Sequence, residues 1–259
     1  MAQASPRGAV LVVLSVSVAV AGCVTGQGHQ APGDRIPEPC PEHPSGRPTA
    51  LYDFNGSARD LSGSNHHGTL HGGAYTFGGV LDVDGTGYME TADDGTLSGL
   101  AAMTASACFR ARRFNVTDGE EGYIISKNYE GDGSSTTDCY CLSVYQEGKK
   151  VQVAANVWAR PESGSADRAA AVAWRQLQPG TWYHVAMTYD RSMLRLYLDG
   201  EEIALAPYKR VLNANTGVCL RIGVCSGPRN RYFDGLIDDV MILDRALSAE
   251  EIRRLAGKG

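Results

Sequence analysis

The last third of the chain decides the fold through three stretches: 182-WYHVAMTYD-190, 194-LRLYLDGEEIA-204 and 233-FDGLIDDVMILDRALSAEEIRRL-255. In the second stretch, Leu194, Leu196 and Leu198 alternate with polar or amphipathic residues. This period of two is typical of a strand with one buried face. Asp199 and Gly200 follow, and an Asp-Gly pair tolerates the positive φ angles of a tight hairpin. The pattern predicts antiparallel strands joined by short turns.

A short helix is predicted at the end of the third stretch. The expected strand over residues 236–243 is followed by Ser248, with Glu251 three positions later. This spacing is a capping box, in which each of the two side chains accepts a hydrogen bond from the other residue's backbone N–H. The helix should therefore begin directly after Ser248.

These three stretches resemble the C-terminal half of the LamG-like jelly-roll domains, relatives of laminin G, pentraxins and legume-type lectins. Residues 50–56 (ALYDFNG), 59–65 (RDLSGSN) and 85–90 (GTGYME) resemble the opening of the same domain. The resemblance implies an all-β fold, a two-sheet antiparallel β-sandwich of the concanavalin A-like jelly-roll type with a short C-terminal helix. Two segments, 127–138 and 158–180, are particular to this chain, and Cys108 stands where such domains usually carry an aromatic residue.

Composition and charge agree with a single extracellular domain over residues 49–257. The chain has 31 Gly, 12 Tyr and 43% hydrophobic residues, which suits a protein of strands and turns with a sizeable core. All-β sandwiches of about 200 residues commonly form one domain. Without residues 1–22, which contain only the charge of Arg7, 23 basic and 29 acidic side chains remain. The resulting net charge of −6 argues against nucleic acid as a partner.

The N-terminus has the features of an export signal over residues 1–22. Arg7 precedes an apolar run over 9–21 that is shorter than the roughly 20 residues of a membrane-spanning helix. The sequence 20-VAGC-23 resembles the lipobox of bacterial lipoproteins, which implies lipidation of Cys23 and a membrane contact through the lipid anchor only. Because Val follows Cys23, the outer membrane or cell surface is expected in a Gram-negative organism. The alternative is an ordinary signal peptide with a chance cysteine.

Residues 23–48 are predicted to be a disordered tether. They contain prolines at 32, 37, 39, 41, 44 and 48 and almost no large apolar side chain. Such a segment buries too little surface to fold, and proline favours extended polyproline II conformations.

Six cysteines remain after lipidation of Cys23: Cys40, Cys108, Cys139, Cys141, Cys219 and Cys225. An even number in an exported chain predicts disulfides, with a connectivity that the sequence leaves open. Cys219 and Cys225 can pair only if the chain turns near Gly223, because a continuous strand would separate them by about 20 Å. Cys139 and Cys141 are expected to have different partners.

A structural Ca²⁺ is implied by the resemblance, because in similar domains calcium often ties the N-terminal loop to the last strand. The matching positions are Asp60, Asn65 and Asp238. Residues 236–242 supply an independent reason, since each strand face receives one carboxylate among apolar side chains. At least one of Asp238 and Asp239 should then be partly buried and need a cation or hydrogen-bond donors. The alternative is that loop amides or an arginine satisfy the carboxylate.

The chain is not expected to be an enzyme. Retaining glycosidases need two carboxylates about 5 Å apart. The acidic pairs 120–121, 201–202 and 250–251 fall in turns or in the terminal helix, where solvated side chains are the simpler interpretation. His184 is expected to make a structural hydrogen bond, and no serine stands in a Gly-x-Ser-x-Gly elbow.

Binding is therefore the expected function. Jelly-roll lectins stack aromatic side chains on sugar rings, and Tyr129, Asp132 and Trp158 lie in or beside the two particular segments. The alternative for Trp158 and Trp174 is packing in the core. The favoured function is an envelope-anchored recognition module for a glycan or an extracellular protein. A structural or adhesive envelope protein without a small ligand is the second candidate, and a glycoside hydrolase the third.

Overall fold

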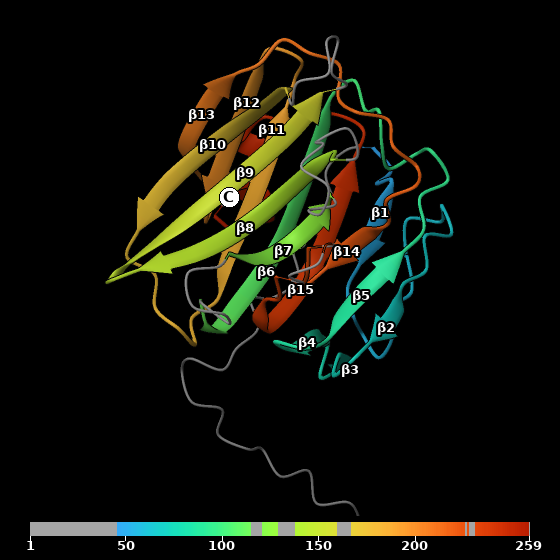
Figure 1. Cartoon of the computed structure of the whole chain (residues 1–259), viewed down its shortest axis with the longest axis vertical. Coiled ribbons are helices and arrows are strands. Elements are labelled where there is room, and N and C mark those ends of the chain that lie inside the picture. The colour runs from blue at the N-terminus through green and yellow to red at the C-terminus, as the bar shows by residue number, and fades with distance from the viewer. Residues whose placement is uncertain are drawn as a thin grey trace, which may run out of the picture.

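The computed structural model describes residues 46–114, 121–128, 138–159, 167–225, 227 and 231–258. The predicted signal peptide, Cys23, Cys40, all but the last three residues of the predicted tether, Tyr129 and Asp132 lie outside these residues. Two antiparallel sheets pack face to face (Figure 1). The two-sheet β-sandwich predicted from the sequence is therefore confirmed.

The first sheet, sheet A, has the strand order β13-β12-β11-β6-β15-β4-β3, and β1 adds to β15 beside this path. In that order its strands are β13 (Glu201–Pro207), β12 (Met193–Leu198), β11 (Tyr183–Tyr189), β6 (Met103–Arg113), β15 (Asp234–Leu243), β4 (Val80–Asp84), β3 (Tyr75–Phe77) and β1 (Ala50–Tyr52). The three sequence stretches that decided the fold supply β11, β12, most of β13 and β15.

The second sheet, sheet B, has the order β10-β9-β8-β7-β14-β5-β2. Its strands are β10 (Asp167–Arg175), β9 (Lys150–Ala159), β8 (Tyr140–Glu147), β7 (Gly122–Lys127), β14 (Leu220–Ile222), β5 (Tyr88–Thr91) and β2 (Thr69–His71). Figure 1 shows β8, β9 and β10 side by side at one end of this sheet.

The core lies between the sheets and follows the alternation of the strands. Leu194, Leu196 and Leu198 are all buried in it, as their spacing predicted. The inward side chains of β9 are Val151, Val153, Ala155 and Val157. Burial of apolar surface at about 25 cal/mol per Å² is the main stabilising contribution of such a core.

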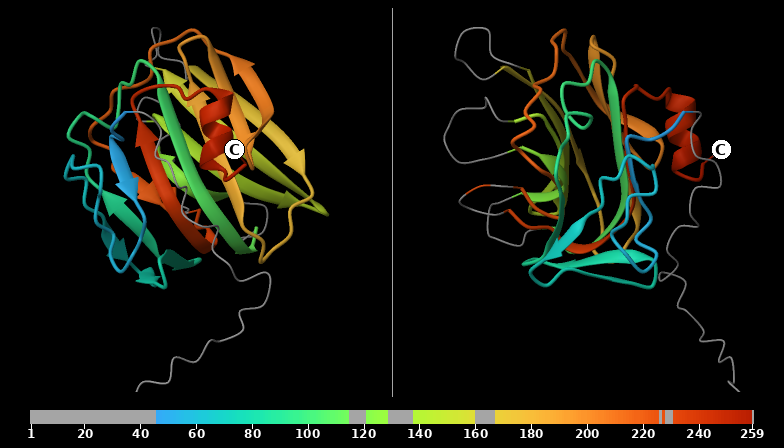
Figure 2. Two further views of the ribbon diagram at one scale, coloured as in Figure 1. Left: turned by 180° about the vertical axis from the view of Figure 1, so that it is seen from behind. Right: turned by 90° about the vertical axis from the view of Figure 1, so that its right-hand side faces the viewer.

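Helix α1 (Ala249–Leu255) begins as predicted. Ser248 is its N-cap, and both hydrogen bonds of the capping box with Glu251 are present. Ile252 is buried against Tyr197 and Met241, which project from the outer face of sheet A. Figure 2 shows α1 outside sheet A, on the side away from sheet B.

A β-bulge in β15 determines which carboxylate is buried. The register of β15 against β6 shifts between Asp238 and Met241, and Asp239 has a positive φ of 47°. Ile237 and Val240 consequently both face the core although they are three residues apart. Asp238 is 5% exposed, whereas Asp239 is half-buried.

Among the described residues, no helix has the length and apolar character needed to cross a membrane.

Candidate binding surface

The outer face of sheet B carries two exposed apolar side chains on its edge strand β10. Ala169, Ala171 and Ala173 point into the sandwich and are buried. The alternate residues Val172 and Trp174 point outward and are 42% and 37% exposed. Small inward residues suit this edge, because β10 packs closely against β13 of the other sheet. The tryptophan therefore faces solvent and not the core.

Three outward side chains form one row across the end of sheet B. Trp174 lies opposite Gln152 of β9, and Gln152 lies opposite Tyr145 of β8. The rings of Trp174 and Tyr145 lean over the glutamine, with centroids 6.3 Å apart and planes at 68°. Tyr145 and Gln152 are half-buried. We call this row, together with Val172, the aromatic surface.

The aromatic surface combines the two kinds of group that sugar binding needs. The exposed faces of Trp174 and Tyr145 offer apolar area to the C–H groups of a sugar ring. The amide of Gln152 can both donate and accept hydrogen bonds, which matches a sugar hydroxyl. A few polar groups among aromatic side chains are typical of ligand sites.

The middle of this face is polar and covered. Ser143 and Asn156 stand on the outer side of β8 and β9 in the rows next to the aromatic surface, yet both are buried. Further along, Ser126 and Cys225 both donate hydrogen bonds to Oδ1 of Asn128, which is 1% exposed. The face is open at the end formed by β8, β9 and β10, and also at its other end on β14, β5 and β2, where the outward side chains are half-buried or exposed.

Trp158, the tryptophan chosen from the sequence, occupies the covered part. It is 6% exposed and packs with Tyr123, Cys141 and Cys225. The guanidinium carbon of Arg168 lies 6.0 Å from its ring centroid. This packing leaves the ring of Trp158 little free area for a ligand. Trp158 is therefore a packed tryptophan, which was the alternative interpretation, whereas Trp174 is exposed.

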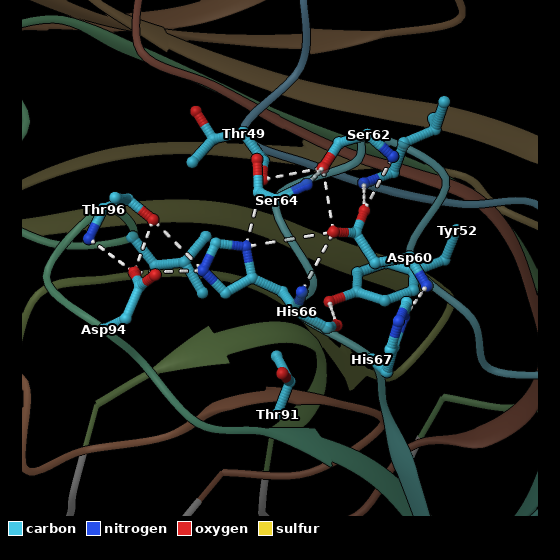
Figure 3. Close-up of polar contacts among 12 residues, drawn as sticks. Thr49, Tyr52, Asp60, Ser62, Ser64, His66, His67, Thr91, Asp94 and Thr96 are labelled. Carbon is cyan, nitrogen blue, oxygen red and sulfur yellow. Dashed lines mark hydrogen bonds and ion pairs between the residues drawn. The ribbon is translucent and has the colours of Figure 1, made fainter.

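Asp60, the first predicted calcium ligand, organises the N-terminal loop. Its Oδ1 accepts hydrogen bonds from the backbone N–H groups of Leu51 and Ser62, and its Oδ2 accepts from the Ser62 hydroxyl and the His66 N–H, all within 3.0 Å (Figure 3). Burial raises the pKa of Asp60, but the donors from Ser62, Leu51 and His66 outweigh it, so the pKa lies below the ordinary value. Four donors leave this carboxylate no free acceptor site for a cation.

His66 extends the loop network to a second loop. One ring nitrogen lies 3.1 Å from the carbonyl oxygen of Thr49, and the other lies 3.1 Å from both Oδ1 of Asp94 and the hydroxyl of Thr96 (Figure 3). The hydrogen bonds from Thr96 and His66 lower the pKa of Asp94. The imidazole thus ties the chain before β1 to the loop after β5.

Asp238, the second predicted ligand, has an environment of the opposite kind. Its Oδ1 accepts one hydrogen bond, from the N–H of Asp239 at 2.8 Å. Burial, with the nearby charges of Asp239 and Asp53, raises the pKa of Asp238 to about 8. A buried carboxylate flanked by two acids is stabilised either by a proton or by a cation.

The three predicted calcium ligands have different surroundings. Asp60 is saturated by loop donors, Asn65 is exposed in a positive-φ turn, and Asp238 has Asp239 and Asp53 as its acidic neighbours. Within the described residues, no group of three or more His, Cys, Asp or Glu side chains is arranged to hold a metal ion. Of the three, only Asp238 has the unsatisfied negative character that fits Ca²⁺.

The cysteines are distributed over several parts of the sandwich. Cys139 belongs to the main core and Cys141 to the cluster around Trp158. Cys108 lies opposite both His184 and Asp238 on the outer face of sheet A. The structure contains no disulfide among the five described cysteines, Cys108, Cys139, Cys141, Cys219 and Cys225, so the expected pairing is not observed there.

Solved structures with the same arrangement include two sugar complexes. Domain 4 of AbnA, an extracellular arabinanase of Geobacillus stearothermophilus in complex with arabinotriose, has a TM-score of 0.57 and 17% identity, covering 81% of this chain and 98% of that one. The binding domain of botulinum neurotoxin DC in complex with SialylT has a TM-score of 0.55 and 12% identity, covering 80% and 50%. The same neurotoxin domain in complex with rat synaptotagmin II has a TM-score of 0.56 and 13% identity, covering 80% and 50%.

These identities show a shared fold and no more. No curated protein matches the sequence. The family model of the concanavalin A-like lectin/glucanases superfamily matches residues 83–253, about two thirds of the chain, from β4 to the middle of α1. The chain belongs to the concanavalin A-like lectin/glucanases superfamily.

Proposed function

We propose that this protein is a glycan-binding module whose ligand lies on the aromatic surface of sheet B. The observation that carries the proposal is the row of Trp174, Gln152 and Tyr145, in which two aromatic rings flank an amide at the end of the face formed by β8, β9 and β10. Similar folds bind sugars, as the arabinotriose and SialylT complexes illustrate.

A protein ligand is the second candidate for the same surface. Tryptophan and tyrosine are enriched among the residues that dominate protein interfaces, and the neurotoxin domain of this fold binds synaptotagmin. The row favours a glycan because the apolar side chains of the aromatic surface itself are Trp174, Tyr145 and Val172, a small set for a protein interface of about 800 Å² per partner. A structural or adhesive envelope protein without a small ligand is the third candidate.

A binding role without catalysis is also part of the proposal. Glu202 lies 3.4 Å from Arg195, Glu250 2.7 Å from Arg253 and Glu251 2.7 Å from Arg245. These acids form ion pairs with arginine, whereas glycoside hydrolysis requires two carboxylates that flank the scissile bond.

Lipidation of Cys23 would place the module on the cell envelope. The lipobox-like sequence supports this anchor, and the proline-rich residues 23–48 support a tether that lifts the domain from the membrane. Cys23→Ala should release the protein from membranes, as judged by fractionation and by labelling with an acyl probe. Full membrane retention of the alanine variant, with no label on the wild type, would refute the anchor.

We further propose that Ca²⁺, if bound, is held at Asp238 and not at Asp60. The raised pKa and single hydrogen bond of Asp238 support this position. Bound there, the ion would neutralise a buried carboxylate on the outer face of sheet A.

A glycan array tests the proposed ligand class. Residues 46–259 of the wild type should bind one group of related glycans, and Trp174→Ala should lose the signal. Phe77→Ala is the matched control, because Phe77 is an exposed aromatic residue on β3 of the other sheet. Binding that survives in Trp174→Ala, or that is lost equally in Phe77→Ala, contradicts the assignment of the surface.

A further inference from the structure

A cavity of about 440 Å³ lies at the end of β10, apart from the aromatic surface. It is partly open to solvent and is bordered by the turn between β12 and β13, by the end of β10 and by α1 with the residues that follow it. Its lining side chains are Arg175, Leu198, Asp199, Glu201, Ile203, Arg253 and Lys258. The volume is within the range of about 300–1,000 Å³ that small-molecule sites occupy.

Arg175 is positioned in this cavity without a carboxylate partner. Its guanidinium donates to the carbonyl oxygens of Trp174, at 3.0 Å, and of Ile203, at 3.5 Å. In the part of the chain that the structure describes, no acidic side chain forms an ion pair with Arg175 or Lys258, whereas Arg253 pairs with Glu250 at 2.7 Å. Arg175 is thus available to a ligand and is held in place by backbone carbonyls, whereas the charge of Lys258 also acts on Asp199, where it lowers the pKa.

The cavity is also lined by two acidic side chains, Asp199 and Glu201. Oδ1 of Asp199 accepts a hydrogen bond from the N–H of His184 at 2.8 Å, which fixes the carboxyl group. Burial raises the pKa of Asp199 above its ordinary value. Glu201 is exposed beside it. A simple anion such as sulfate would be attracted by the cations and repelled by these two carboxylates.

A ligand that matches this mixture of cations and acids carries one carboxylate and several hydroxyl groups. Arginine binds carboxylates in a bidentate fashion, so Arg175 and Lys258 suit the carboxylate. Carboxyl oxygens accept hydrogen bonds from hydroxyls, so Asp199 and Glu201 suit the hydroxyl groups. Leu198 and Ile203 supply apolar area for the C–H face of a ring.

We propose that this cavity binds a uronic acid unit of an acidic glycan. This inference rests on the proposed function only in taking a glycan as the ligand. The site itself is separate, because Arg175 and Trp174 are consecutive residues of β10 and their side chains lie on opposite faces of that strand. The two sites can therefore be tested with different sugars.

Isothermal titration of the whole chain with monomeric galacturonate and glucuronate tests the cavity. The neutral sugars galactose and glucose and inorganic sulfate serve as comparison ligands. We expect at least one uronate to bind, and the matched neutral sugar and sulfate to bind at least tenfold more weakly. Arg175→Gln should weaken uronate binding by about tenfold or more, as expected for loss of a charge-assisted hydrogen bond.

Lys258→Gln should also weaken uronate binding. Because Lys258 is exposed, this substitution should leave the fold intact and tests the site even if Arg175→Gln fails to fold. Arg254→Gln is the matched control, since Arg254 lies on α1 but does not line the cavity. Absence of uronate binding, sulfate binding of equal strength, or equal loss in Arg254→Gln overturns the proposal. Uronate binding without any neutral-glycan signal on the array supports the cavity and counts against the aromatic surface. A neutral-glycan signal on the array without uronate binding contradicts the proposal for the cavity and leaves the aromatic surface supported.

Discussion

Trp158 and Trp174 project from the same outer face of sheet B, yet they are 6% and 37% exposed. Trp158 packs with Tyr123 under the guanidinium of Arg168. Trp174 meets Tyr145 in an edge-to-face arrangement and keeps more than a third of its surface open to solvent. Tryptophans on neighbouring strands therefore have different roles, one in stability and one available for binding.

Trp158→Ala should accordingly destabilise the fold far more than Trp174→Ala. Removal of a buried tryptophan costs about 3–5 kcal/mol of unfolding free energy, whereas truncation of a largely exposed one should cost about 1 kcal/mol or less. Urea unfolding followed by circular dichroism measures both values. Equal losses in the two variants would contradict the different burial of the two rings.

The alternation of residues predicted much of this fold but not which face of β10 is outward. Leu194 to Leu198 and the Ser248 capping box indicated their elements correctly because their local patterns have one simple solution. In β10, alanines alternate with Val172 and Trp174, and hydrophobicity alone favours the larger residues inside. Because β13 of the other sheet lies close to β10, the inner face of β10 has room only for small residues, and the larger ones face outward. The closeness of two sheet edges is not a local property of the sequence.

The candidate calcium ligands show the same limit of local patterns. The sequence correctly indicated a buried carboxylate in β15, but the selection of Asp238 depends on the bulge at Asp239. The saturation of Asp60 by four donors depends on the path of the whole loop between β1 and β2. Neither feature follows from residue spacing.

Lys127→Met should destabilise the protein strongly. Its Nζ lies 3.0 Å from Oδ2 of Asp93, both side chains are fully buried, and the amine also donates to the carbonyl oxygens of Asn215 and Val218. Loss of one partner of a buried pair costs about 3–5 kcal/mol, because the other charge stays behind. Chemical denaturation should show this loss. The surface pair of Arg195 and Asp190 is the control, and Arg195→Gln should cost about 1 kcal/mol or less.

The stability of the calcium-free protein should depend on Asp238 between weakly acidic and alkaline pH. The pKa of Asp238 is about 8 in the folded state and near 3.8 in the unfolded state. A raised pKa means that the stabilising effect of the proton is complete below the unfolded value and is lost as pH rises through the folded value.

Unfolding in EDTA at about pH 5 and about pH 9 measures this effect. The wild type should lose on the order of a few kcal/mol more than Asp238→Asn over this interval, because the asparagine cannot ionise. Identical pH dependence of the two proteins would show that Asp238 is not a buried protonated acid.

Calcium should stabilise the wild type if it binds at Asp238. A free concentration of 100 times the dissociation constant should add about 2.7 kcal/mol, by mass action. Asp238→Asn should abolish the increase in melting temperature. Asp60→Ala should lower the baseline stability by about 2–4 kcal/mol through lost hydrogen bonds, but it should keep the calcium response. If Asp60→Ala abolishes the calcium-dependent increase in melting temperature and Asp238→Asn does not, calcium binds in the N-terminal loop at Asp60 and not at Asp238.

The aromatic surface is tested most directly by the dissociation constant of one array-selected neutral glycan for four proteins: wild type, Trp174→Ala, Tyr145→Ala and Phe77→Ala. Truncation of a central aromatic contact typically costs about 2 kcal/mol or more, which corresponds to roughly thirtyfold weaker binding. We predict such a loss for Trp174→Ala, a smaller loss for Tyr145→Ala and an unchanged constant for Phe77→Ala, with all four proteins folded. An unchanged constant for Trp174→Ala would contradict the central claim that the glycan lies on this face of sheet B.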